Sequence, residues 1–186
     1  MNWKKLLAWA SVVGLGCTAY AQGQFTNAVR ADIEIFETQT NLLIVKGFGS
    51  GGSVNFGASV ITVRLKDTFN PDTGRRLQGI VITFTEGERR ERATVDYDEI
   101  EPLIKAIDYI RSVSYDVTGL PSFEATYQTR DGFRVIGFGG HRQTSVQHFL
   151  QFDDCARISL NSDQIAQLRG VISQARTTLD ELRPAK

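Results

Sequence analysis

The sequence has little of the chemistry on which most small catalytic and redox sites depend. Its 186 residues include two cysteines, two histidines, two tryptophans and one methionine. The 21 basic and 21 acidic side chains balance, so the net charge gives no reason to expect a polyanionic partner. With 41% hydrophobic and 23% charged residues, the composition excludes disorder, collagen and coiled coil, and indicates a folded domain.

Residues 1–21 have the pattern of a secretory signal peptide. Lys4 and Lys5 precede an apolar run over residues 6–16, which is too short for the roughly 20 residues of a membrane span. Ala19 and Ala21 then form a small-x-small cleavage pattern. We expect cleavage after Ala21, which leaves a mature chain of residues 22–186 with a net charge of −2.

An alternative is cleavage at Cys17 with lipidation, which Gly16 fits but Leu15 does not. Both interpretations predict an exported bacterial protein, periplasmic or extracellular, with no transmembrane segment in the mature chain. Cleavage after Ala21 leaves Cys155 as the one mature cysteine, without a partner for an internal disulfide.

Most of the chain from residue 31 alternates apolar and polar residues, as half-buried strands do. The clearest segments are residues 61–65, 80–84 and 123–127, and the apolar run 42–45 predicts a central strand. Turn residues at 70–74, 86–88 and 130–132 separate the strands and predict antiparallel hairpins. We expect about nine or ten strands.

Two segments, residues 100–110 and 165–182, instead place apolar residues on one helical stripe. Asp98 with Glu101 predicts a capping box for the first helix, and Asn161 with Gln164 predicts one for the second.

The prediction is therefore an α+β fold with antiparallel β-sheets and two amphipathic helices. It is a single domain over 22–186, in which strands followed by a helix occur twice, in pseudo-repeat halves of about 31–117 and 122–184. Each helix is expected to cover the inner face of its own half's sheet. This order of elements is similar to that of the Whirly-type single-strand-binding fold, and the similarity includes no sequence motif.

The glycine-rich segment 47–57 begins with a formal GxGxxG motif, but the alternating residues 59–65 follow it in place of a helix. A flexible hairpin loop is therefore expected, and no cofactor. Asp96, Asp98, Glu99 and Glu101 are interpreted as helix-start acids rather than as an acid–base or metal cluster. Residues 67–72 are interpreted as a turn rather than a calcium loop.

His141, His148 and Cys155 are the candidate catalytic residues, because a histidine could activate the thiol. Their spacing of seven points neighbours to opposite faces of a regular strand, so convergence needs a turn. His148 shares parity with apolar neighbours and is expected on the core side. No metal site is expected, since zinc needs three or four converging ligands.

The residues between Glu86 and Arg92 mix both charges and predict a solvated hairpin, and no nucleic-acid partner is expected. The sequence favours a non-enzymatic exported module of the cell envelope that binds another protein or a small ligand. The alternative is a small thiol- or metal-dependent enzyme that uses Cys155 with His148 or His141.

Overall fold

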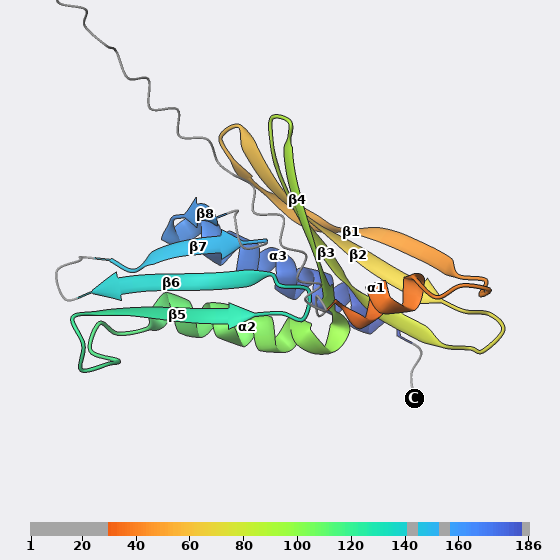
Figure 1. Cartoon of the computed structure of the whole chain (residues 1–186). Coiled ribbons are helices and arrows are strands. Elements are labelled where there is room, and N and C mark those ends of the chain that lie inside the picture. Colours follow the sequence, from red (N-terminus) through yellow and green to blue (C-terminus); the bar gives the residue numbers. More distant parts are fainter. Residues whose placement is uncertain (1–29, 141–144, 153–156, 184–186) are drawn as a thin grey trace, which may run out of the picture.

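The computed structural model describes residues 30–140, 145–152 and 157–183 (Figure 1). This part of the chain forms three helices and eight strands, fewer strands than predicted. The strands make two antiparallel four-stranded sheets, so the fold is α+β. A run of four strands followed by a helix occurs twice, in the order that the sequence predicted.

Sheet A is a meander of four long strands in sequential order: β1 (Val45–Phe56), β2 (Ser59–Phe69), β3 (Arg76–Glu86) and β4 (Arg89–Asp96). Two of its three hairpins, β2–β3 and β3–β4, turn where the sequence predicted. In the β2–β3 turn, Asn70 Oδ1 accepts hydrogen bonds from the backbone N–H groups of Asp72 and Thr73. This Asx turn accounts for Asn70, whereas Asp67 pairs with Arg76.

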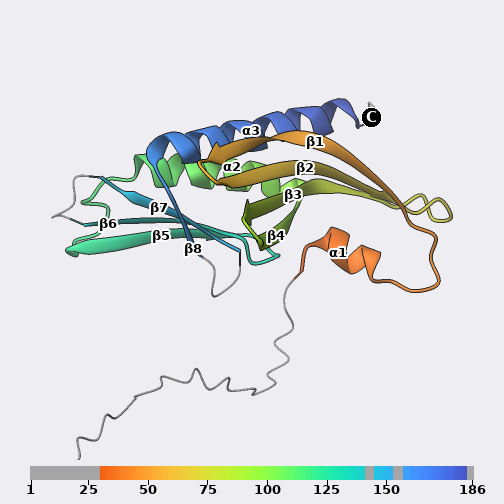
Figure 2. The ribbon, with the colours of Figure 1, turned by 90° about the horizontal axis from the view of Figure 1, so that it is seen from above.

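Sheet B repeats the meander with shorter strands: β5 (Ser122–Gln128), β6 (Arg134–Gly140), β7 (Gln147–Gln151) and β8 (Arg157–Leu160). Helices α2 (Tyr97–Ser112) and α3 (Ser162–Glu181) follow the two sheets and pack against each other. In Figure 2 both helices lie on one side of the two sheets.

The helices do not cover their own sheets in the expected way. Helix α3, from the second half, packs on β1, β2 and β3 of sheet A, while α2 contacts strands of both sheets. The halves therefore share one core, whose fully buried members come from both sheets and both helices. They include Ile61, Val63, Ile80, Ile82, Ile107, Val135, Leu150, Leu168 and Ile172.

The short helix α1 (Asp32–Glu37) lies on the opposite face of sheet A, where it packs against β3 and β4 (Figure 2). Its sequence alternates like a strand, but Ile33 and Phe36 are three residues apart and both are buried, at 0% and 1% exposure. Gly79 of β3 makes this approach possible. A Cβ there would lie 2.8 Å from Ile33 Cδ1 and 2.3 Å from the Val95 carbonyl oxygen.

Two predictions near β1 are wrong. Residues 42–44 precede the strand and Leu43 is 61% exposed, so the apolar run is no central strand. The glycine-rich segment is not a hairpin loop, because it forms most of β1 itself, at the edge of sheet A. Gly52 has a φ of +113° beside a β-bulge, and a Cβ there would meet Val171 of α3 at 3.1 Å. Glycine thus lets the edge strand follow the helix closely.

One of the two predicted capping boxes is confirmed. Asn161 Oδ1 accepts from the Gln164 backbone N–H, and Gln164 Oε1 accepts from the Asn161 N–H, both at 2.8 Å. The box at Asp98 and Glu101 is wrong, because α2 begins at Tyr97 and its N-cap residue, Asp96, makes no side-chain cap. Within the described ranges, no helix has the length and apolar character needed to cross a bilayer.

Candidate functional site

Sheet A leaves one face uncovered by α2 and α3, and this open face has a basic groove. The groove has a volume of about 260 Å³ and lies beside the end of α1. Its lining comes from all four strands and from α1: Lys46, Phe48, Arg64, Lys66, Val81, Thr83, Arg90, Arg92 and Glu37. Five cations and one carboxylate therefore line a concave surface in a chain whose overall charge is balanced.

Strand alternation explains why these cations lie together. Side chains two residues apart on a strand share a face, and cross-strand partners lie beside each other. Phe48 is the register partner of Lys66, and Thr83 is the partner of Arg92. The opposite residues of the same strands, such as Ile61, Val63 and Ile82, enter the core.

The inner end of the groove holds a buried ion pair. Lys66 is 2% exposed, and its Nζ lies 2.9 Å from Glu37 Oε1. Glu37 also accepts from Lys46 Nζ and from Thr68 Oγ1, each at 2.9 Å. Burial alone would raise the pKa of Glu37, but the hydrogen bonds from these three donors outweigh it and lower the pKa below its ordinary value.

A second carboxylate of α1 meets the same face one helical turn earlier. Glu34 Oε1 accepts from Thr94 Oγ1 at 2.7 Å and lies 3.5 Å from the guanidinium of Arg92. Arg92 remains 52% exposed, so this pair stays open to solvent. Helix α1 therefore places two carboxylates against the open face of sheet A.

The outer part of the groove has cations without acidic partners. Among the residues that the structure describes, neither Arg64 nor Arg90 forms an ion pair, and both side chains are exposed. The Arg64 guanidinium lies 5.2 Å from the ring centroid of Phe48, which is itself 57% exposed. A cation–π contact of this kind orients the arginine and leaves its fork of N–H donors free for an anion.

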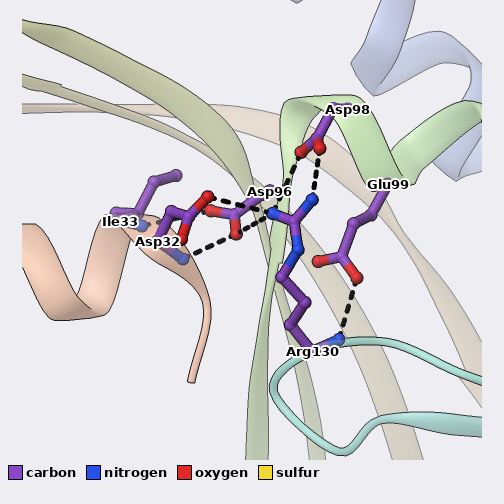
Figure 3. A network of polar contacts seen from close by, with 6 residues as sticks. All are labelled: Asp32, Ile33, Asp96, Asp98, Glu99 and Arg130. Atoms are coloured by element: carbon purple, nitrogen blue, oxygen red, sulfur yellow. Dashed lines mark hydrogen bonds and ion pairs between the residues drawn. The ribbon is translucent and has the colours of Figure 1, made fainter. Parts of the chain in front are cut away.

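A network around Arg130 fixes α1 in place (Figure 3). Asp96 accepts the backbone N–H groups of Asp32 at 2.6 Å and Ile33 at 3.1 Å, and so caps α1 instead of its own helix. Arg130, in the β5–β6 hairpin, donates to Asp96 at 2.8 Å, to Asp32 at 3.2 Å and to Asp98. One arginine thus ties sheet B to α1 and to the start of α2.

The same hairpin makes two backbone-to-carboxylate bonds. Glu99 Oε1 accepts from the Arg130 N–H at 2.8 Å, and Asp131 Oδ2 accepts from the Thr94 N–H at 2.7 Å. Burial raises the pKa of both carboxyls despite these bonds. Glu101 instead pairs with Lys105 and Arg176. The four acids that were predicted to stabilise the start of α2 therefore connect different helices and strands. The capping assignment for Asp98 and Glu101 is wrong.

The candidate catalytic residues are only partly placed. His148 lies on the core face of β7 at 3% exposure, as predicted, and it hydrogen-bonds to the backbone of Ile110. Its Nε2 is buried without a partner among the described residues, and burial foremost lowers its pKa. His141 and Cys155 lie outside the described residues, as do residues 1–21 with Cys17. In the part of the chain that the structure describes, no cluster of histidine, cysteine and acidic residues could hold a metal ion.

Sequence reasoning missed the groove because charge was counted along the chain. In the hairpin at 86–92 acids and bases are mixed in sequence, yet Arg90 and Arg92 share the open face while Arg89 pairs with Glu91 on the other. Assigning each charged residue to a strand face would have separated Arg90 and Arg92 from Arg89 and Glu91. Comparisons with protein-family models, with curated proteins and with solved structures found no match to this chain.

Proposed function

We propose that this protein is an exported, non-enzymatic binding module of the bacterial cell envelope, and that the basic groove on sheet A is its binding surface for an anionic ligand. One observation carries the proposal: Arg64 and Arg90 are exposed cations in a concave site and face no carboxylate in the described chain.

The groove is suited to binding rather than to chemistry. Arginine presents a planar fork of donors that matches carboxylate or phosphate groups, and it does not deprotonate. The described lining has no histidine, cysteine or solvent-facing carboxylate pair that could act as a nucleophile or as a general acid and base. A ligand would be held by charge-assisted hydrogen bonds over the apolar surface of Phe48 and Val81.

The export assignment rests on the basic, apolar and small-residue pattern of residues 1–21, with Cys17 as the alternative processing site. Export would place the groove where envelope proteins and small ligands are available. Edman sequencing of the protein purified from its own cells tests this: a start at residue 22 supports release, and an intact Met1 contradicts export.

The binding proposal is tested by fluorescence anisotropy at low ionic strength with labelled polyglutamate, polyphosphate and heparin. The Arg64→Gln/Arg90→Gln variant is expected to bind at least about tenfold more weakly than wild type. Lys105→Gln/Arg111→Gln, which removes the same charge from α2, is the matched control and should bind as wild type does. Equal binding by both variants, or no binding of any polyanion, overturns the proposal.

The alternative, a thiol- or metal-dependent enzyme using Cys155 with His148 or His141, is not favoured by the described geometry. His148 faces the core beneath α2 and not the groove. It has its own test: an activity that Cys155→Ser abolishes without lowering the melting temperature would support it.

A further inference from the structure

We infer that the ligand of the basic groove is an acidic segment of a protein partner, with two carboxylates three or four residues apart. The inference rests on the proposed function and adds the chemical class of the ligand. It starts from the observation that α1, a segment of the chain itself, already binds part of the same face through its carboxylates.

Helix α1 shows how the open face of sheet A binds an acidic segment. Glu37 meets Lys66 of β2, and Glu34 meets Arg92 of β4. Two carboxylates at positions i and i+3 of one short helix thus contact strands β2 and β4, with β3 between them. Positions i and i+3 lie about 5–6 Å apart on a helix, whereas β2 and β4 lie about 10 Å apart and the register offsets Lys66 from Arg92 by four residues, about 13 Å along the strands. The long cationic side chains therefore reach inward to the helix.

The same pair of cations occurs once more, one step further along the strands. Arg64 lies two residues before Lys66 on β2, and Arg90 lies two residues before Arg92 on β4. Strands β2 and β4 run in the same direction because each pairs antiparallel with β3. Both steps therefore point the same way and cover about 7 Å. The second pair repeats the first, but among the described residues no carboxylate meets it.

The surroundings of the second pair fit a peptide better than other polyanions. Phe48 and Val81 line the groove beside the cations, so the occupant meets apolar surface as well as charge. The α1 sequence, Asp32–Glu37, combines acidic and apolar residues in that way. Polyphosphate has no apolar part, and single-stranded nucleic acid needs successive aromatic platforms. Among the described residues of the lining, Phe48 is the one aromatic side chain.

The test compares labelled alanine-based helical peptides of about 15 residues by fluorescence anisotropy with the full-length protein. The first peptide has two glutamates at i and i+3 beside a phenylalanine. The second has the same composition with the glutamates at i and i+2, on different faces of the helix. The first is expected to bind at least about fivefold more tightly, and Arg64→Gln or Arg90→Gln alone should remove the preference.

Three results overturn the inference in distinguishable ways. Equal affinity for the two peptides shows that net charge alone is recognised. Tighter binding of polyphosphate, of an acidic oligosaccharide or of single-stranded DNA, still lost in Arg64→Gln/Arg90→Gln, leaves the groove as a binding site for another class of ligand. Absence of binding to every polyanion overturns the proposed function as well.

Discussion

Both sheets are antiparallel meanders of four strands, yet the side chains on their open faces differ in chemistry. On sheet A, the face away from α2 and α3 presents Lys46, Arg64, Lys66, Arg90 and Arg92. On sheet B, the equivalent positions of β5, β6 and β7 include Glu124, Thr126, Phe138 and Phe149. Both sheets contribute apolar residues to one core. The core thus accounts for the fold, and the difference between the open faces is the basis of the proposed function.

The difference extends to how the faces are stabilised. Sheet A has a buried lysine whose charge is balanced by Glu37 of α1, whereas Glu124 on sheet B is exposed and accepts from Thr126 two residues away. A buried charge that loses its partner is costly, while an exposed one is solvated by water. Equivalent changes of charge should therefore have unequal effects on the two sheets.

The largest effect is expected for Glu37→Gln. It leaves Lys66 charged at 2% exposure, so unfolding free energy in urea should fall by about 3 kcal/mol. Glu124→Gln on sheet B should change it by less than about 0.5 kcal/mol. Adding Lys66→Met to Glu37→Gln should restore most of the loss, because an apolar chain of similar size needs no counter-charge. A full loss that persists in the double variant would show that the ion pair is not its cause.

The next effect concerns two glycines, one on each sheet, that let a helix approach closely. Gly79→Ala on sheet A should cost about 2 kcal/mol, because its Cβ would lie 2.3 Å from a backbone carbonyl as well as against Ile33. Gly137→Ala on sheet B should cost about 1 kcal/mol, since its Cβ would meet the Ile110 Cγ2 methyl at 2.7 Å, and a side chain can shift. Thermal unfolding of both variants measures this order, and the reverse order would contradict the account of α1 docking.

The smallest effect is a difference in pH response. The folded pKa of His148 is below 6.5, so the unfolded state binds the proton first and stability falls as the pH decreases from about 6.5 toward that pKa. The folded pKa of Glu37 is below 4.5, so its contribution is present above 4.5 and is lost as the pH falls through the folded pKa. Urea unfolding across pH should show that His148→Gln reduces the loss of stability below about pH 6.5. Glu37→Gln should reduce the loss below pH 4.5. An unchanged profile in both variants would contradict these assignments.

The sequence predicted the parts of the fold that depend on local pattern. Alternation identified the strands at Ile61, Ile80 and Phe123, and the capping box at Asn161 identified the start of α3. These signals are local because one buried face or one helix terminus is enough to produce them. The order of strands and helices followed from them.

The parts that failed depend on contacts between distant segments. Glycines 47–52 were predicted to form a loop, but they allow β1 to bend against α3, which is more than 100 residues away in sequence. Asp98 was assigned to its own helix, although Arg130 of the other half binds it. The groove was missed for the same reason, because its cations come from separate strands and only the register brings them together.

The most direct test of the central claim is amide chemical-shift mapping by NMR, with the i, i+3 acidic peptide titrated into the full-length protein. If the acidic peptide binds the basic groove, the largest shifts fall on open-face residues of β2 and β4, at Arg64, Arg90 and their neighbours, while sheet B changes little. Largest shifts on the open face of sheet B, at Phe138 and Phe149, would contradict it.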